Sequence, residues 1–261
     1  MKRIPVSLDH KNIPEAFQPF FRDATVYDSS CSAEARVWFL DKEPGFYLKR
    51  SPKGRLAKEA AMTNFFHSKG LGAEVSGYES GEFDWLLTRR VPGEDCTWQT
   101  YLDDPVRLCD TTAQLLRTLH ETAAEGCPVP NRTADYLATV CKNYQAGIFS
   151  PEFLPEDQKA TTAKEAWEIA QQVGKGLKAD TLLHGDYCLP NIMLEHWQFS
   201  GFIDLDGAGV GDRHIDLFWG VWTLEFNLKT DRYGQRFLDA YGRDAIDMDI
   251  LSAIPYFEAF G

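Results

Sequence analysis

Polar side chains that could carry out phosphoryl transfer are concentrated in the segment 184–191. It reads His-Gly-Asp-Tyr-Cys-Leu-Pro-Asn, so Asp186 precedes Asn191 by five residues, and a second carboxylate, Asp204, follows 18 residues after the first. In phosphoryl transfer to an alcohol, one carboxylate orients the acceptor hydroxyl and takes its proton. Another carboxylate and an amide oxygen hold Mg²⁺ against the phosphates. The spacing of these three side chains therefore predicts a kinase active site.

Short β-rich segments dominate the first third of the chain. We expect strands over 35–40, 45–49 and 83–88, because β-branched and aromatic residues cluster there between turn residues. A helix is expected over 56–68, where apolar residues recur at helical spacing. The sequence Val-Pro-Gly at 91–93 then suits a hinge or linker.

Helical patterns dominate the remainder. From Val106 onward, leucines recur at steps of three and four residues. Helices are also expected over 131–178, interrupted by a proline-bounded loop at 149–155, and from 217 to the end.

Two short apolar segments, 181–183 and 199–203, are expected as strands on either side of the polar segment. The chain is therefore predicted to be an α+β protein with two lobes. Residues 1–89 form a β-rich lobe with one helix, and residues 90–261 form a larger helical lobe.

The charge is unevenly distributed along the chain. The net charge is −12, and residues 1–89 carry 13 Lys and Arg against 12 Asp and Glu, whereas residues 90–261 carry 14 against 27. This acidity argues against nucleic acid or an anionic membrane surface as a partner. An acidic second lobe would attract a polycationic ligand. Acidity also favours solubility in many proteins, so charge alone leaves both interpretations open.

The sequence also predicts a cytoplasmic protein. It has no stretch approaching the roughly 20 apolar residues of a membrane helix, and its first ten residues turn polar before a signal core could form. No C-x-x-C pair occurs among its six cysteines, so reduced, packed thiols are expected in place of a zinc site or disulfide framework. The cysteines are at 31, 96, 109, 127, 141 and 188.

The arrangement His184-Gly185-Asp186-x-x-x-x-Asn191, with Ile203-Asp204 and then Gly209-x-Gly211-Asp212-x-x-x-Asp216, resembles the core of the aminoglycoside phosphotransferases. These enzymes have a two-lobed, protein-kinase-like fold and phosphorylate antibiotics, which confers resistance. The string Cys-Leu-Pro-Asn-Ile-Met at 188–193 is similar to the branch that modifies the 3′ or 3″ hydroxyl. The resemblance extends over nearly the whole chain.

The resemblance implies a role for each residue of this core. Asp186 is the catalytic base, and Asn191 and Asp204 bind Mg²⁺. His184 is a structural member of the loop, and Asp216 supports the loop from a helix.

The resemblance also extends to the nucleotide side, for ATP or GTP. Tyr-Leu-Lys at 47–49 matches the strand that bears the phosphate-binding lysine, and Glu59 matches the ion-pair partner of that lysine, Lys49. Tyr47 would stack on the purine, although it could equally be an ordinary strand aromatic. Ser32 belongs to the loop expected to cover the phosphates, and Val91 to the hinge that binds adenine.

On the acceptor side, the resemblance implies that carboxylates bind the amines of a cationic aminoglycoside. The ending Phe-Glu-Ala-Phe-Gly resembles the acidic-aromatic tail of the 3′ enzymes more than that of the 3″ enzymes. The candidate acceptor-binding residues are Glu152, Glu156, Asp157, Glu225, Glu258 and Phe260. Glu152, Glu156 and Asp157 could equally be solvated loop charges.

The sequence departs from the pattern of the 3′ and 3″ enzymes in three places. Asp206-Gly207 stands where they have Gly-Arg, Trp222 replaces an arginine, and Phe226 replaces a glutamate for which Glu225 is a nearby substitute. These departures leave open a kinase of another small alcohol, such as choline or a sugar. A catalytically inactive nucleotide-binding module is a further alternative. A protein kinase is not favoured, because the G-x-G-x-x-G loop is absent.

Overall fold

The computed structural model describes residues 3–7, 13–31 and 35–261 of the chain, and these form two compact units. The first unit contains residues up to 96 together with 190–206, and the second contains 97–189 and 207–261. Residues 190–206 thus belong to the first unit, although the prediction groups them with residues 90–261. The assignment of nucleotide binding and acceptor binding to separate lobes stays a prediction.

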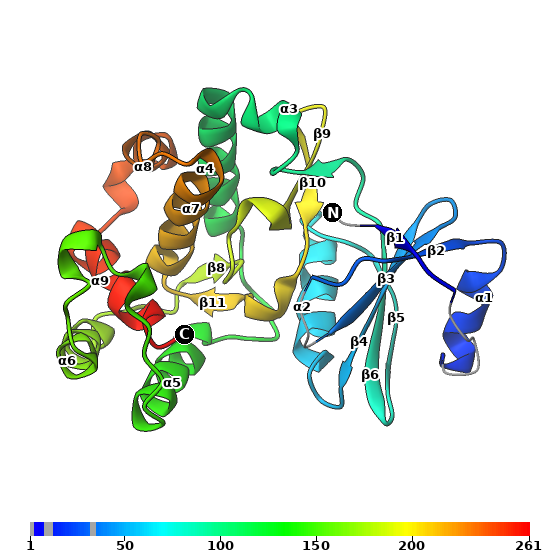
Figure 1. The fold of residues 1–261 in the computed structure, drawn as a ribbon, viewed down its shortest axis with the longest axis horizontal. Coiled ribbons are helices and arrows are strands. Elements are labelled where there is room, and N and C mark those ends of the chain that lie inside the picture. The colour runs from blue at the N-terminus through cyan, green and yellow to red at the C-terminus, as the bar shows by residue number, and fades with distance from the viewer. Residues whose placement is uncertain (1–2, 8–12, 32–34) are drawn as a thin grey trace. The chain divides into compact units, whose positions relative to one another are not determined.

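A six-stranded antiparallel sheet forms the frame of the first unit (Figure 1). Its order is β1-β2-β3-β4-β6-β5. The strands are β1 (Ile4–Pro5), β2 (Thr25–Asp28), β3 (Arg36–Asp41), β4 (Phe46–Pro52), β5 (Val75–Ser80) and β6 (Phe83–Arg89). The three strands predicted in this region correspond to β3, β4 and β6, whereas the short edge strand β1, β2 and the polar strand β5 carry no comparable sequence signal.

Each face of this sheet packs on a different segment. Side chains alternate between the faces of a strand, so the neighbours Leu48 and Lys49 on β4 point to opposite sides. Leu48 joins an apolar core with residues of the short helices Glu15–Phe17 and α1 (Gln18–Phe21). On the other face, helix α2 (Ala57–Ser68) packs Ala60 against Leu86 of β6. The face that carries Lys49 is therefore also the face that α2 covers.

Asp84 fastens the start of α2 to the sheet. Its side chain is fully buried on β6 and accepts hydrogen bonds from the backbone N–H of Leu56 (3.0 Å) and from the hydroxyl of Ser80 (2.6 Å). Burial alone would raise the pKa of Asp84, but the hydrogen bonds to its carboxylate outweigh burial and lower the pKa. The carboxylate is therefore kept ionised where it holds the helix.

A second, three-stranded sheet completes the first unit, in the order β10-β9-β7. Its strands are β7 (Glu94–Asp95), β9 (Ile192–Glu195) and β10 (Gln198–Phe202). Because β9 pairs with β7, the hairpin β9–β10 joins the segment 190–206 to residues 94–95, which come soon after β6 in the chain.

Helices form most of the second unit, as the sequence predicts. They are α3 (Gln99–Leu102), α4 (Pro105–Glu121), α5 (Arg132–Gln145), α6 (Ala163–Gly174), α7 (Arg213–Leu228), α8 (Gly234–Tyr241) and α9 (Met248–Glu258). Strands β8 (Thr181–Leu183) and β11 (Gly209–Gly211) pair as a small antiparallel sheet. Short 3₁₀ helices occur in both units or at their borders, at Pro151–Phe153, Glu156–Gln158, Leu189–Asn191, Leu205–Gly207 and Arg243–Ala245.

The core of the second unit lies among α5, α6, α7 and α9. Tyr136 of α5, Ala170 of α6, Ile215 of α7 and Phe257 of α9 pack together there, all buried. Among the helices of the described ranges, none combines the length and the apolar character that a membrane crossing requires.

Replacing Asp84 should destabilise the first unit. We expect Asp84→Ala to lower the free energy of unfolding by roughly 2–4 kcal/mol, because it leaves the buried Leu56 N–H and Ser80 hydroxyl without their acceptor. Urea unfolding would measure this. Glu82→Ala, an exposed carboxylate on the same hairpin, is the matched control and should change stability by less than about 0.5 kcal/mol.

The stability difference between wild type and Asp84→Ala should change with pH in one direction. Because the pKa of Asp84 is lowered on folding, its contribution is present above the pKa of the unfolded chain, about 3.9. The stability difference between wild type and Asp84→Ala should therefore be constant above about pH 5 and shrink as the pH falls below about 4. A difference that grows on acidification would contradict this role.

Candidate active site

Lys49 and Glu59 form an ion pair inside the first unit. The Lys49 Nζ donates to Glu59 Oε1 at 3.0 Å and to Oε2 at 2.8 Å. Lys49 lies in the middle of β4, paired with Val37 on one side and Leu86 on the other, and Glu59 lies in the first turn of α2. The Glu59 side chain is buried, and the hydroxyl of Thr63 donates to its backbone carbonyl one turn later. The pairing that the sequence predicts is therefore present.

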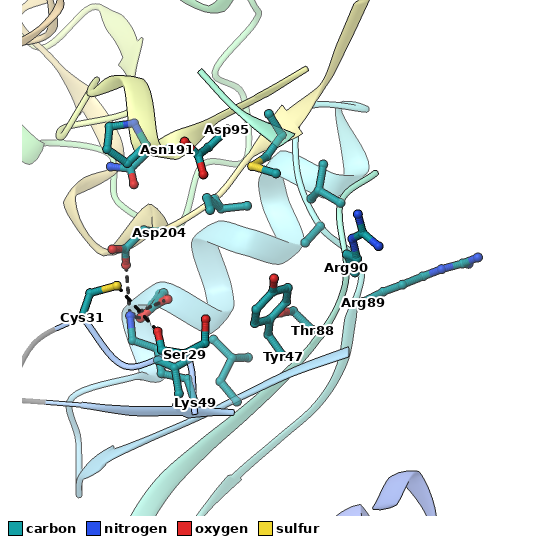
Figure 2. Close-up of a pocket in the computed structure, with 18 of the residues that line it drawn as sticks. Ser29, Cys31, Tyr47, Lys49, Thr88, Arg89, Arg90, Asp95, Asn191 and Asp204 are labelled. Atoms are coloured by element: carbon teal, nitrogen blue, oxygen red, sulfur yellow. Dashed lines mark hydrogen bonds and ion pairs between the residues drawn. The ribbon is translucent and has the colours of Figure 1, made fainter. Parts of the chain in front are cut away.

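Asp204 is a second carboxylate on the same ammonium group. The Lys49 Nζ donates to Asp204 Oδ1 at 3.0 Å, as Figure 2 shows. Burial would lower the pKa of Lys49, but the Glu59 and Asp204 carboxylates outweigh it and raise the pKa. Lys49 thus stays charged, with its position set by two carboxylates from separate segments of the chain.

Asn191 and Asp204 lie on adjacent segments of the first unit. Asn191 ends the 3₁₀ helix Leu189–Asn191, and its backbone carbonyl accepts a hydrogen bond from the Ile203 N–H at 3.1 Å. The side chain of Asn191 is buried, whereas that of Asp204 is 54% exposed. Asp204 has a backbone φ of +59°, a conformation that is uncommon for a residue with a Cβ and that marks a local constraint. Asp204 thereby contacts Lys49, and Asn191 lines the same pocket.

A pocket of about 360 Å³ contains these side chains, within the size range of ligand sites in proteins. Tyr47, Lys49 and Thr88 line it from the sheet, and Asn191 and Asp204 line it from the segment 190–206 (Figure 2). Charged residues such as Lys49, Glu59 and Asp204 and apolar residues such as Leu86, Val91 and Met193 both line it. The pocket can therefore contact charged and apolar parts of one ligand.

Tyr47 and Val91 contribute apolar surface to the pocket. The Tyr47 ring packs on Phe39, with ring centroids 5.0 Å apart, and lines the pocket with its remaining surface. Val91 is buried in a small cluster with Ala73 and Met193. Both predicted nucleotide-side residues therefore lie in the pocket with Lys49.

The loop before β3 is only partly described. Ser29 and Cys31 line the pocket, but Ser32, the residue proposed for this loop, lies outside the described residues. Asp95 of β7 also lines the pocket and is buried. It was not among the sequence predictions, because an isolated acidic residue after a hinge has no distinguishing pattern.

In the second unit, Asp216 holds the backbone of the predicted catalytic loop. It lies on α7, is fully buried, and accepts hydrogen bonds from the N–H groups of His184 (2.7 Å) and Gly185 (2.8 Å). The Nε2 of His120 lies 3.3 Å from the same carboxylate, and its Nδ1 lies 2.8 Å from the hydroxyl of Tyr241. Burial lowers the pKa of His120. His120 is a supporting residue that sequence reasoning missed.

Two glycines come into backbone contact in this loop. Gly185 has a φ of +80°, and a Cβ at this position would lie 1.9 Å from the carbonyl oxygen of Gly207. That carbonyl accepts a hydrogen bond from Arg132 Nε at 2.8 Å. A Cβ at position 207 would in turn lie 2.9 Å from the carbonyl oxygen of Gly185, which gives a physical reason for glycine at this position, one of the departures from the family pattern.

Asp186 sits between these supports and is partly exposed. Its backbone N–H donates to His184 Nδ1 at 3.3 Å, and its carbonyl accepts from the Cys188 N–H at 2.8 Å. The His184 side chain is fully buried and thus acts inside the loop. Asp186 is in the second unit, whereas Lys49, Asn191 and Asp204 are in the first.

Glu258 is buried near Asp186 in the second unit. The Tyr136 hydroxyl donates to Glu258 Oε1 at 2.7 Å. Burial raises the pKa of Glu258 to about 7, with the Asp186 charge adding to the shift while the Tyr136 hydrogen bond and the Arg132 charge oppose it. Only 7% of Glu258 is exposed, so little of its surface is accessible.

Within the described residues, no hydrogen bond, ion pair or ring contact joins the other predicted acceptor residues to one another. Glu152, Glu156 and Asp157 are exposed, and Glu156 pairs with Lys159 at 2.7 Å. Burial raises the pKa of the half-buried Glu225. Phe260 is fully buried and packs on other aromatic rings of the core.

Aromatic side chains occupy the two remaining departures. The rings of Trp222 and Phe226 stack with centroids 4.9 Å apart and an interplanar angle of 14°. Phe153 packs edge-on against Trp222 and against Trp219. Phe226 is 54% exposed. An arginine and a glutamate are thus replaced by a stacked, uncharged pair.

Comparison with known proteins shows which family shares these features. Residues 30–253 match the model of the phosphotransferase enzyme family. A probable aminoglycoside 3′-phosphotransferase from Lactococcus lactis is 46% identical over 262 residues, covering 100% of this chain and 99% of the relative.

Solved structures agree with the predicted fold. An aminoglycoside-3′-phosphotransferase of type VIII matches with a TM-score of 0.71 and 22% identity, over 95% of this chain and 100% of that chain. The aminoglycoside phosphotransferase APH(3″)-Id from Streptomyces rimosus, in complex with ADP and streptomycin, matches with a TM-score of 0.73 and 23% identity, over 97% and 99%. The predicted α+β fold is confirmed. The chain belongs to the phosphotransferase enzyme family, together with aminoglycoside 3′-phosphotransferases.

Proposed function

We propose that this enzyme transfers the γ-phosphoryl group of ATP or GTP to a hydroxyl of an aminoglycoside, at the 3′ position. The observation that carries the proposal is the pocket in which Lys49, paired with Glu59, lies beside Asn191 and Asp204. The relative from Lactococcus lactis, named a probable aminoglycoside 3′-phosphotransferase, supports the acceptor class. Phosphorylation of the antibiotic would confer resistance on the cell that makes the enzyme.

On the nucleotide side, the phosphates lie at Lys49 and the purine lies at Tyr47 and Val91 in this proposal. Lys49 contacts the phosphates, where its charge is maintained by Glu59. Tyr47 packs against the base, and the backbone near Val91 binds its edge. Nucleoside triphosphates are abundant in the cytoplasm, and we place the enzyme there.

Asn191 and Asp204 would hold Mg²⁺ at this pocket. A carboxylate and an amide supply the hard oxygen ligands that this ion prefers, and both side chains line the pocket with Lys49. When bound, Mg²⁺ neutralises charge on the phosphates. The hydrogen bond between Lys49 and Asp204 supports this role, because Lys49 is the residue proposed to contact the phosphates.

Asp186 acts as the base in this proposal. Its backbone is fixed on both sides, by the Asp216 contacts to His184 and Gly185 and by its own hydrogen bonds within the loop. A carboxylate on a rigid loop can orient the acceptor hydroxyl and take its proton as the phosphorus–oxygen bond forms. Asp186 therefore supplies the chemistry, and the loop supplies its orientation.

The acceptor site is proposed in the second unit, where the excess negative charge of the chain lies. Glu258 and the exposed Glu152, Glu156 and Asp157 provide carboxylates for ammonium groups. A second candidate acceptor is another small alcohol, such as choline or a sugar. The stacked pair of Trp222 and Phe226 favours this alternative, because aromatic faces also bind quaternary ammonium groups and sugar rings.

An acceptor panel tests the proposal directly. Phosphate transfer from ATP with Mg²⁺ would be measured for kanamycin, neomycin, streptomycin, a kanamycin lacking its 3′ hydroxyl, and choline. We expect turnover on kanamycin and loss of turnover on the 3′-deoxy analogue. Turnover on choline alone would replace the aminoglycoside by the second candidate. Retained turnover on the 3′-deoxy compound would refute the 3′ position.

The role of Asp186 predicts a separation between chemistry and nucleotide binding. Asp186→Ala should lower kcat by roughly 10²–10⁴-fold, the usual contribution of a general base, while the dissociation constant for ADP stays within about twofold of wild type. Isothermal calorimetry and steady-state kinetics measure the two quantities. Asp135→Ala, an exposed carboxylate on α5, is the control and should match wild type in both. Weak ADP binding by Asp186→Ala would count against the assigned role.

A further inference from the structure

Arg132 holds a backbone carbonyl beside the predicted catalytic loop. It is the first residue of α5, and its Nε donates to the Gly207 carbonyl at 2.8 Å. The same carbonyl oxygen lies so close to Gly185 that it would be 1.9 Å from a Cβ added there. Gly185 directly precedes Asp186 in the chain. A guanidinium group therefore holds the carbonyl that packs on the residue before the proposed base.

The start of α5 is itself firmly placed. The Asn131 side chain caps the helix by accepting a hydrogen bond at 3.0 Å from the N–H three residues later. The carbonyl of Val129, just before the helix, accepts from the Val210 N–H at 2.8 Å. Thr133 is buried, and its hydroxyl donates at 2.6 Å to a backbone carbonyl that precedes β8. The helix can therefore carry Arg132 in a fixed direction.

Two contacts position the backbone of Gly185. Asp216 accepts its N–H at 2.8 Å, and the Gly207 carbonyl fills the place of the missing Cβ. The first is a hydrogen bond to the loop itself. The second is a packing contact, which constrains the loop only while Gly207 cannot move away. Glycine has no side chain that could fix Gly207, so the hydrogen bond from Arg132 supplies this constraint.

We propose that Arg132 is a positioning residue, whose hydrogen bond keeps the Gly207 carbonyl packed on Gly185 and thereby holds Asp186 in its reactive orientation. This inference rests on the proposed role of Asp186 as the base. It assigns a specific effect on turnover to an arginine that no sequence motif singles out.

Arg132 has a second property that could affect turnover, its charge. The charge opposes the rise in the pKa of Glu258. The Arg132 guanidinium lies 6.0 Å from the ring of Tyr136, whose hydroxyl donates to the Glu258 carboxylate. The proposed role needs an N–H at the position of Nε, whereas an effect through Glu258 needs a positive charge. Substitutions that keep the N–H and remove the charge therefore separate the two.

Kinetics of two Arg132 variants make this separation, with whichever acceptor the wild type phosphorylates. Arg132→Met has a methyl group in the place of Nε and should lower kcat roughly 10-fold, because misplacement of a reacting group is costly. KM for ATP and for the acceptor should change less than about twofold. Arg132→Gln has an uncharged N–H donor at the same number of bonds from Cα and should keep kcat within about threefold of wild type.

The matched control removes a different arginine of the same unit. Arg236 of α8 is exposed and donates to Asp110 at 2.7 and 2.6 Å. Arg236→Met should leave kcat and both KM values unchanged.

A double-mutant cycle tests whether Arg132 acts through Gly207. Gly207→Ala adds a Cβ that would lie 2.9 Å from the Gly185 carbonyl oxygen, so it should disturb the same contact and lower kcat. If both changes act by moving the Gly207 carbonyl, Arg132→Met with Gly207→Ala should be no slower than the slower single variant. Losses that multiply would overturn the proposed link.

Amide hydrogen exchange gives a readout that needs no acceptor. On variants shown to be folded by circular dichroism, the peptide with the His184 and Gly185 N–H groups should exchange faster in Arg132→Met than in wild type. It should exchange at the wild-type rate in Arg132→Gln, and peptides from α7 and α9 should exchange equally in all three proteins.

Several results would overturn the inference. These are unchanged loop exchange in Arg132→Met, faster exchange throughout the second unit, wild-type kcat in Arg132→Met, or equal losses of kcat in the Met and Gln variants. A wild type inactive on every acceptor would instead refute the proposed function, and the exchange rates would still decide whether Arg132 holds the loop.

Discussion

The buried ion pair between Lys49 and Glu59 is the contact on which the organisation of the nucleotide pocket depends. Glu59 is 6% exposed, and a carboxylate at that depth is strongly unfavourable unless a cation compensates it. The ion pair therefore fixes the distance between β4 and α2 and the rotation of α2 about its own axis. Asp84 enforces the same geometry from the other end, because its hydrogen bond to the Leu56 N–H holds the start of α2 on β6. The remaining N–H donor of Lys49 hydrogen-bonds Asp204. Through this contact the segment 190–206 completes the pocket.

In the second unit, α7 has the corresponding role for the catalytic loop. Asp216 and Thr223 bind the two ends of the loop. These two residues lie two helical turns apart on one face of α7. One rigid element thus positions the loop that carries Asp186, which is consistent with sites built on helices being more precise than sites built on loops alone.

The parts predictable from sequence are those whose signal is local. Clusters of β-branched and aromatic residues predict strands β3, β4 and β6, and apolar residues at helical spacing predict helix α2. Spacing within 19 residues predicts the set Asp186, Asn191 and Asp204. The Lys49–Glu59 pair was expected from the family resemblance and is present. Family membership and the α+β fold are confirmed by the comparisons. The catalytic, metal-binding and acceptor-binding roles of individual residues stay predictions.

The residues that sequence reasoning missed are those whose partners are distant in the chain. His120 reaches Asp216 across 96 residues, Arg132 reaches Gly207 across 75, and Thr223 reaches Leu189 across 34. No local pattern distinguishes such a histidine or threonine from an ordinary core residue. Burial is the second property that the sequence did not predict. Glu258 and Phe260 resemble an acidic-aromatic tail in sequence, yet both are buried because α9 packs into the core of the second unit.

The most direct test of this account is the ADP affinity of a Glu59→Gln variant, measured by isothermal calorimetry on protein shown to be folded by circular dichroism. If Glu59 fixes the charge and position of Lys49, ADP binding should weaken roughly tenfold or more, equivalent to about 1.4 kcal/mol. Glu79→Gln, an exposed glutamate on β5 of the same unit, should bind ADP like wild type. A folded Glu59→Gln protein with wild-type ADP affinity would contradict the claim that this ion pair organises the nucleotide site.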